Sequence, residues 1–171
     1  MTCSIYLIRH GIAEDLGPLC PTDEERPLTP EGIRRLEQSV KGLRALEVSV
    51  DRILSSPLVR AKQTAEIVAA GLACREPLMI VDALRPGARF EALAATLERL
   101  GRDTSVALVG HEPSMGEFAA RLIGAARPLL FQKGSVCRID ADTLPPVGAG
   151  ALQWLLPPRA LRAFHRPRSA D

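Results

Sequence analysis

Short apolar runs alternate along this chain with longer segments in which apolar residues recur every three or four positions. The apolar runs predict strands over residues 4–9, 50–56 ("VDRILSS"), 77–81 ("PLMIV") and 105–111 ("SVALVGH"). A segment with helical spacing follows each of them, and two alternating stretches, 135–140 and 150–156, then predict antiparallel edge strands. This order predicts an α/β fold, a three-layer α/β/α sandwich around a largely parallel central sheet.

The helix boundaries are marked by capping residues as well as by periodicity. In "PLTPEG" (27–32), Thr29 suits the N-cap and Pro30 suits the first helical position. The chain has 171 residues, a length that fits one domain, and it shows no internal repeat and no long linker. We therefore expect a single domain over residues 1–157. The last segment, 158–171 ("PRALRAFHRPRSAD"), is expected to be a basic, disordered tail that could dock an acidic partner.

Charge and cysteine content exclude several classes of protein. The net charge of +2 is too small to make nucleic acid or an anionic membrane the main partner. No apolar stretch approaches the roughly 20 residues that span a bilayer, and no secretion signal is visible. The four cysteines lie far apart without a C-x-x-C pair, which predicts reduced thiols and no zinc site. We expect a cytoplasmic monomer.

Three predicted strands end in residues that suit a phosphate site. The first delivers Arg9, His10 and Gly11, the second leads into a helix that carries Arg60, and the fourth delivers Gly110 and His111. In open α/β sheets, ligands bind beyond the carboxyl ends of the strands. Helix N-termini attract anions, and arginines donate to phosphoryl oxygens in a planar fork. These segments therefore predict an anion site at one edge of the sheet.

Each of these side chains also has an ordinary structural interpretation. His10 could anchor a loop, Arg60 could be a solvated helix arginine, and His111 could cap its helix. The chain has only three histidines, and two of them directly follow strand ends, whereas His165 lies in the basic tail. That conjunction favours a functional site.

Three segments carry a resemblance to a known family. "LIRHG" (7–11), "SSPLVRAKQTAE" (55–66) and "VGHEPSM" (109–115) resemble the histidine phosphatase superfamily, whose fold is phosphoglycerate-mutase-like. The small size and "ERPLTPEG" (25–32) resemble its SixA-type phosphohistidine phosphatase branch. The resemblance implies that His10 is a nucleophile that becomes phosphorylated, and that no metal or cofactor takes part. It also implies a phosphoryl-binding set around that nucleophile, namely Arg9, Arg60, His111 and Gly11.

Arg26 and the proton donor are less well defined by the resemblance. Arg26 lies in a segment that the family places beside the active site, so it either contacts substrate or pairs with Glu24, Glu25 or Glu31 at the surface. Larger family members keep an acidic proton donor after the third strand, where this chain reads "VDALRPGARF" (81–90). Glu14 and Asp82 are the candidates for a general acid. Glu112 is expected in the first turn of a helix.

We expect a phosphatase that hydrolyses phosphohistidine on a protein, such as a phosphotransfer domain. A broad-specificity phosphatase of small phosphomonoesters is the alternative enzyme. The chain is too short for the insertions with which mutases hold a sugar phosphate, so a mutase is the weaker interpretation. A non-catalytic module that binds a phosphorylated ligand is the alternative outside enzymes. The intact set of Arg9, His10, Arg60 and His111 counts against it.

Overall fold

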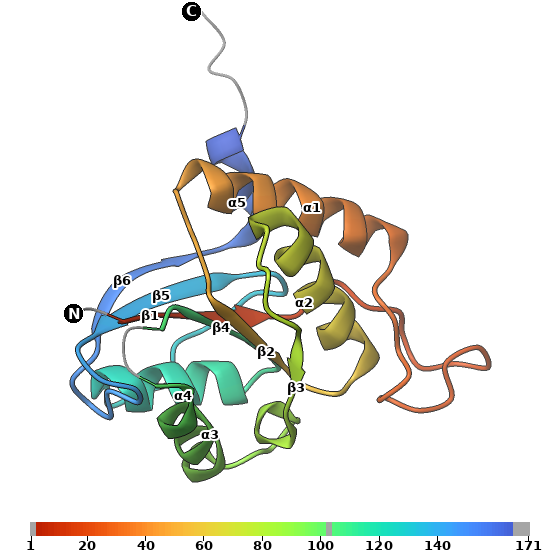
Figure 1. The fold of residues 1–171 in the computed structure, drawn as a ribbon. Coiled ribbons are helices and arrows are strands. Elements are labelled where there is room, and N and C mark those ends of the chain that lie inside the picture. Colours follow the sequence, from red (N-terminus) through yellow and green to blue (C-terminus); the bar gives the residue numbers. More distant parts are fainter. Residues whose placement is uncertain (1–2, 102–103, 166–171) are drawn as a thin grey trace, which may run out of the picture.

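The computed structural model describes residues 3–101 and 104–165, which build one six-stranded sheet with helices on both faces (Figure 1). The strand order is β3-β2-β4-β1-β5-β6. The strands are β1 (Cys3–Arg9), β2 (Arg52–Ser55), β3 (Met79–Ile80), β4 (Val106–Gly110), β5 (Val136–Ala141) and β6 (Ala151–Leu156). The α-helices are α1 (Pro30–Ala45), α2 (Val59–Leu72), α3 (Phe90–Leu97), α4 (Ser114–Ile123) and α5 (Pro158–His165).

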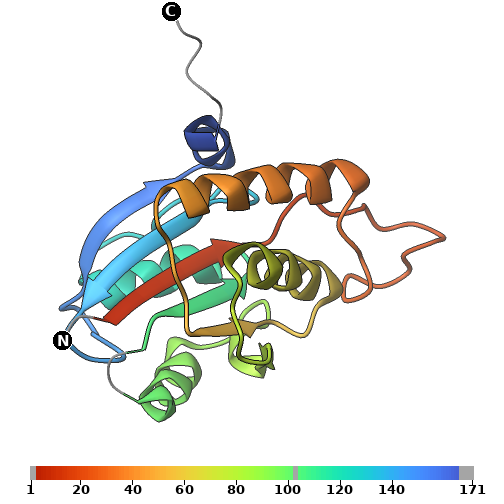
Figure 2. The same cartoon turned by 45° about the horizontal axis from the view of Figure 1, so that its top comes forward.

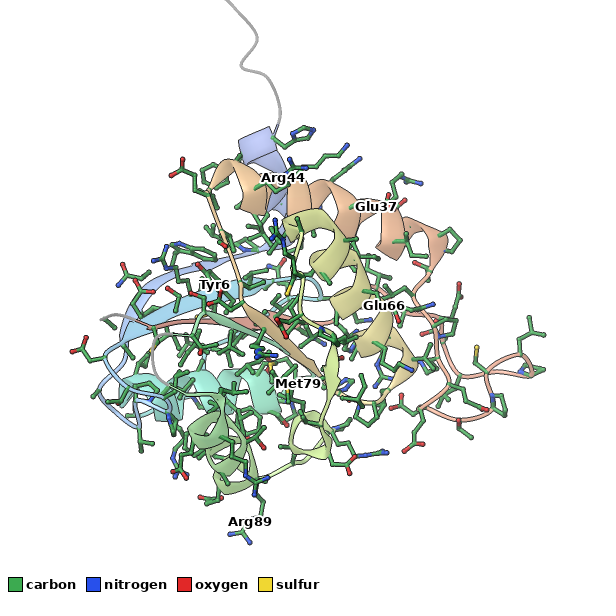
Figure 3. All side chains as sticks on the ribbon, viewed as in Figure 1. Tyr6, Glu37, Arg44, Glu66, Met79 and Arg89 are labelled. Atoms are coloured by element: carbon green, nitrogen blue, oxygen red, sulfur yellow. The ribbon has the colours of Figure 1, made fainter. Side chains whose placement is uncertain are left out.

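The sheet is mixed, with its parallel half in the order that alternating strands and helices produce. β1 pairs in parallel with β4, β4 with β2, and β2 with β3. β5 and β6 run antiparallel, as predicted, but β5 pairs with both β1 and β6 and is therefore an interior strand. The edges are β6 and the two-residue β3, where Met79 and Ile80 are exposed. Figure 3 shows Met79 at this edge.

Two helical layers cover the sheet. α1, α2 and α5 lie over one face, and α3 and α4 lie over the other, as the two views show (Figures 1 and 2). β1 and β4 lie between these layers and are almost completely buried, which explains their uninterrupted apolar runs. The predicted α/β/α sandwich is confirmed.

Helix α1 begins where the sequence predicted. Thr29 is its N-cap, and the Thr29 Oγ1 accepts a hydrogen bond from the Gly32 N–H at 2.9 Å. Pro30 occupies the first helical position. Val40 and Leu43 are buried along the face that meets the sheet and α2.

The C-terminal segment differs from its prediction. Residues 158–165 form helix α5, which packs on α1, so the expectation of a disordered tail is wrong for these residues. Leu161 is fully buried, and a Cβ on Gly42 of α1 would lie only 1.9 Å from the Leu161 carbonyl oxygen. A glycine on α1 therefore allows the close approach that orders α5, a tertiary contact that composition does not reveal. Residues 166–171, the rest of that tail, lie outside the described residues.

Two further expectations concern the cysteines and the membrane. All four cysteines are unpaired thiols; Cys3, Cys20 and Cys137 are buried, and Cys74 is half-buried. Burial raises the pKa of Cys137 to about 12. None of the helices within residues 3–101 and 104–165 is long and apolar enough to cross a membrane.

Candidate active site

The two strand-end histidines meet because β1 and β4 are neighbours in parallel register. Arg9 pairs with Gly110 at the carboxyl ends of these strands. The His10 backbone N–H then donates to the Gly110 carbonyl at 3.1 Å. The imidazole rings of His10 and His111 consequently lie with their centroids 5.1 Å apart.

Helix α2 brings Arg60 to the same place. It begins at Val59, directly after the turn that follows β2, so Arg60 lies in its first turn. The Arg60 Nε donates to the Nε2 of His10 at 3.2 Å. Arg60, His10 and His111 are only 5%, 6% and 3% exposed, so these polar groups form a largely desolvated cluster.

A cavity of about 310 Å³ opens beside this cluster. Charged and imidazole side chains make up nearly all of its wall, and the lining residues are Arg9, His10, Asp23, Arg26, Arg60, Pro86, His111, Glu112 and Lys133. All four predicted catalytic residues, with Arg26, therefore converge on one cavity. Cations outnumber carboxylates in its wall, which suits an anionic ligand.

Gly11 lies behind the cavity and supports it. A Cβ at this position would lie 2.5 Å from the Leu36 side chain of α1, so any residue other than glycine would force that side chain to move. The Gly11 N–H donates to the Thr64 hydroxyl on α2 at 3.1 Å. Gly11 thus holds the loop after β1 between two helices, and it does not line the cavity.

The tautomer of His10 is fixed by the carbonyl of Gly11. The His10 Nδ1 lies 2.7 Å from that oxygen, and a carbonyl can only accept, so Nδ1 carries the proton. The Nε2 then holds a lone pair. Burial, with further contributions from His111, Arg60 and Arg9, lowers the pKa of His10 to about 3. His10 is therefore a neutral imidazole at pH 7 with a nucleophilic nitrogen beside Arg60.

His111 is also neutral and is held by Ser56. The His111 Nε2 lies 2.8 Å from the Ser56 hydroxyl, and that hydroxyl also accepts the Leu58 N–H. Ser56 thus stabilises the turn before α2 and also orients a site histidine. Burial chiefly lowers the pKa of His111 to about 4. Its Nδ1 is enclosed and has no hydrogen-bond partner among the described residues.

Asp23, which the sequence did not single out, holds the arginines. It accepts from the Arg60 Nη2 at 2.9 Å and from the Arg26 Nη1 at 2.7 Å. Partial burial opposes ionisation of Asp23, but the hydrogen bonds from Arg60 and Arg26 outweigh it and lower its pKa. Arg26 therefore pairs with Asp23 rather than with Glu24, Glu25 or Glu31, and it lines the cavity as well.

Neither expected general acid lies in the cavity wall. Asp82 is 85% exposed in its side chain and pairs with Arg85 at 2.8 Å. Glu14 contributes its backbone carbonyl as an acceptor for Arg26, and its side chain is not part of the wall. Glu112, by contrast, does line the cavity. Because α4 begins only at Ser114, Glu112 precedes the helix and stays next to His111, contrary to its expected place in a first turn.

The carboxylates and histidines described here do not form a metal cluster. No group of three or more His, Cys, Asp or Glu side chains within the described ranges could hold a metal ion. Arg9 contributes charge instead: its Nη1 donates to the Phe131 carbonyl at 2.7 Å, whereas its Nε is buried and lacks a partner among the described residues. The arrangement places a neutral nucleophile among arginine donors, which is chemistry suited to a phosphoryl group.

Comparison with known proteins agrees with this geometry. Residues 5–86 match the family model of the histidine phosphatase superfamily (branch 1). The phosphohistidine phosphatase SixA of Escherichia coli is 28% identical over 92% of this chain and 96% of its own length. The SixA homolog of Haemophilus influenzae is 31% identical over 81% of this chain and 88% of its own length. A structure of the protein histidine phosphatase SixA complexed with tungstate superposes with a TM-score of 0.82, at 28% identity, over 92% of this chain and 99% of that chain.

Proposed function

Because this chain belongs to the histidine phosphatase superfamily, in its SixA-type branch, we propose that it removes phosphate from phosphohistidine on a protein. That it is a phosphatase of the histidine-phosphatase type follows from the family. The protein substrate is our inference, with a phosphotransfer domain as its expected form. The observation that carries the proposal is the neutral His10, whose Nε2 lone pair lies in a cavity lined by Arg9, Arg60 and His111.

In the first half of the proposed reaction, the His10 Nε2 attacks phosphorus while the bond from phosphorus to the substrate nitrogen breaks. In the free protein the Arg60 Nε donates to this nitrogen at 3.2 Å. As the phosphoryl group binds, its oxygens would take over this N–H, which frees the Nε2 lone pair for the attack. Arg9, Arg60 and the N–H of His111 would hold the phosphoryl oxygens as charge develops on them. Arg26 would contact the substrate from the cavity wall. Water then hydrolyses the phosphorylated His10.

The chemistry of the leaving group favours phosphohistidine over alcohol esters. The pKa of an imidazolium is about 6.5, so a phosphohistidine whose other ring nitrogen carries a proton expels its imidazole readily as the neutral ring. A serine or sugar alkoxide is far more basic and depends on a positioned general acid, which typically contributes about 10²–10⁴-fold. Neither Glu14 nor Asp82 lies where it could supply that acid. We also propose that no metal is needed, since the guanidiniums and imidazole provide the positive charge.

The test is to compare kcat/KM for a histidine-phosphorylated protein, an aryl phosphate and an alkyl phosphate at neutral pH. We expect that order, with the alkyl ester slowest. Equal or faster turnover of the alkyl ester would refute the preference and support the small-molecule phosphomonoesterase. Binding of all three without turnover would instead support the non-catalytic module.

A further inference from the structure

The cavity contains two carboxylates in opposite environments. Asp23 is tied to Arg60 and Arg26 by ion pairs that keep it ionised. Glu112 makes no ion pair within 4 Å among the residues that the structure describes, and its Oε1 is enclosed without a hydrogen-bond partner there. A buried carboxylate oxygen that lacks a partner is costly unless it takes up a proton or a water. Glu112 is therefore the carboxyl group in this wall that is able to exchange a proton.

Backbone hydrogen bonds hold the Glu112 side chain in place, but no ion pair among the described residues neutralises its charge. Burial raises its pKa above the ordinary glutamate value, whereas Arg9 and the backbone N–H groups of Gly116 and Phe131 oppose that shift. The backbone carbonyl of Phe131 in turn accepts a hydrogen bond from the Arg9 Nη1 at 2.7 Å. Two carboxyl groups in one site whose pKa values are pushed apart commonly divide the acid–base work between them.

Resting on the proposed function, we propose that Glu112 is the catalytic base of the second half of the reaction. In the first half, the Nε2–P bond forms as the P–N bond of the substrate breaks, and the imidazole leaves as the neutral ring with a proton already on its other nitrogen, so this half needs no proton from Glu112. In the second half, a water oxygen attacks the phosphorus of phosphorylated His10, and the Glu112 carboxylate takes the proton from that water. The P–N bond electrons return to Nε2, and the products are neutral His10, hydrogen phosphate and protonated Glu112.

This assignment separates the two half-reactions experimentally. An aryl phosphate has a good leaving group and needs little help in the first half, but attack by water still needs a base. In Glu112→Gln, whose carboxamide keeps an acceptor oxygen for the backbone N–H groups, we expect kcat for 4-nitrophenyl phosphate to fall by about 10²–10⁴-fold. The initial burst of nitrophenolate should slow by less than tenfold, and phosphorylated His10 should accumulate.

Glu98→Gln provides the matched control, because it removes the same charge from an exposed position at the end of α3 that does not line the cavity. We expect its kcat to stay within about twofold of the parent. If Glu112→Gln lowers the burst and kcat together, Glu112 only supports the site; if it lowers neither, Glu112 takes no part. Either result overturns the inference. Should Glu112→Gln fold poorly by circular dichroism, Glu112→Asp, which keeps the carboxyl but shortens its reach, must show the same accumulation. Absence of labelled His10 in the parent protein would refute the proposed function itself.

Discussion

Acidification should destabilise this protein well before most carboxylates titrate, because two histidines are buried in the neutral form. The pKa values of His10 and His111 are about 3 and about 4 in the folded chain, against about 6.5 for an unfolded histidine. The unfolded chain therefore binds protons first as the pH falls below 6.5. The contribution of these groups to stability is complete above pH 6.5 and is lost progressively below it.

The size of the effect follows from these values. At pH 5.5, one unit below the unfolded pKa, protonation stabilises each unfolded histidine by about 1.4 kcal/mol, while both folded rings remain neutral. The pair should therefore remove about 3 kcal/mol from the free energy of unfolding, a large share of the roughly 5–15 kcal/mol typical of domains. Both rings are almost completely enclosed, so solvent screening does not reduce this figure much.

The assay is urea denaturation at pH 7.5 and pH 5.5, followed by the fluorescence of Trp154 and by circular dichroism. The parent should lose about 3 kcal/mol between these pH values, each of His10→Asn and His111→Asn about half of that, and the double variant almost none of it. Glu112 acts in the opposite direction, but it is present in every variant, so the differences isolate the histidines. His165→Asn, changed at an exposed position on α5, should behave like the parent. Equal losses in the parent and the double variant would refute this account of the buried pair.

Other consequences concern the arginines and metals. Arg60→Lys keeps the charge but loses the fork that holds Asp23, so we expect kcat/KM to fall by about 10²–10³-fold; activity within fivefold of the parent would remove Arg60 from the site. Because Arg60 is buried, its replacement could also disturb packing, so thermal melting must show that the variant is folded. Arg26→Ala should raise KM by roughly 10–100-fold through loss of one charged contact, and an unchanged KM would place Arg26 outside the substrate path. EDTA should leave kcat unchanged; inhibition that a divalent ion reverses would instead indicate a metal mechanism.

The predictable part of the site consists of residues at the ends of sheet strands. Arg9 ends β1, His10 and His111 directly follow β1 and β4, and parallel neighbours in a sheet bring such ends together. Arg60 belongs to the same set because its helix begins directly after a strand. Sequence patterns locate these residues because a buried strand and the helix that follows it each leave a periodic apolar signal, and these four residues lie at the junctions between the two.

The remaining parts of the site depend on tertiary contacts. Asp23 lies in the long segment between β1 and α1, and its pairing with Arg60, 37 residues away, leaves no periodic signal. Glu112 was assigned to a helix because α4 was expected to follow His111 directly. Pro113, a residue favoured at helix starts, was the available sign that Glu112 stays outside. Helix α5 was missed because Gly42 and Leu161, which bring it onto α1, are distant in sequence.

The central claim is that His10 carries the phosphoryl group during turnover, and direct mapping of the phosphoenzyme tests it best. The protein is mixed with a radiolabelled phosphate donor, quenched within one turnover, digested under alkaline conditions that preserve N-linked phosphate, and the labelled peptide is sequenced. We predict alkali-stable, acid-labile label on His10, formed at least as fast as steady-state turnover and absent from His10→Ala. Label on any other residue, or full activity in His10→Ala, would contradict the account.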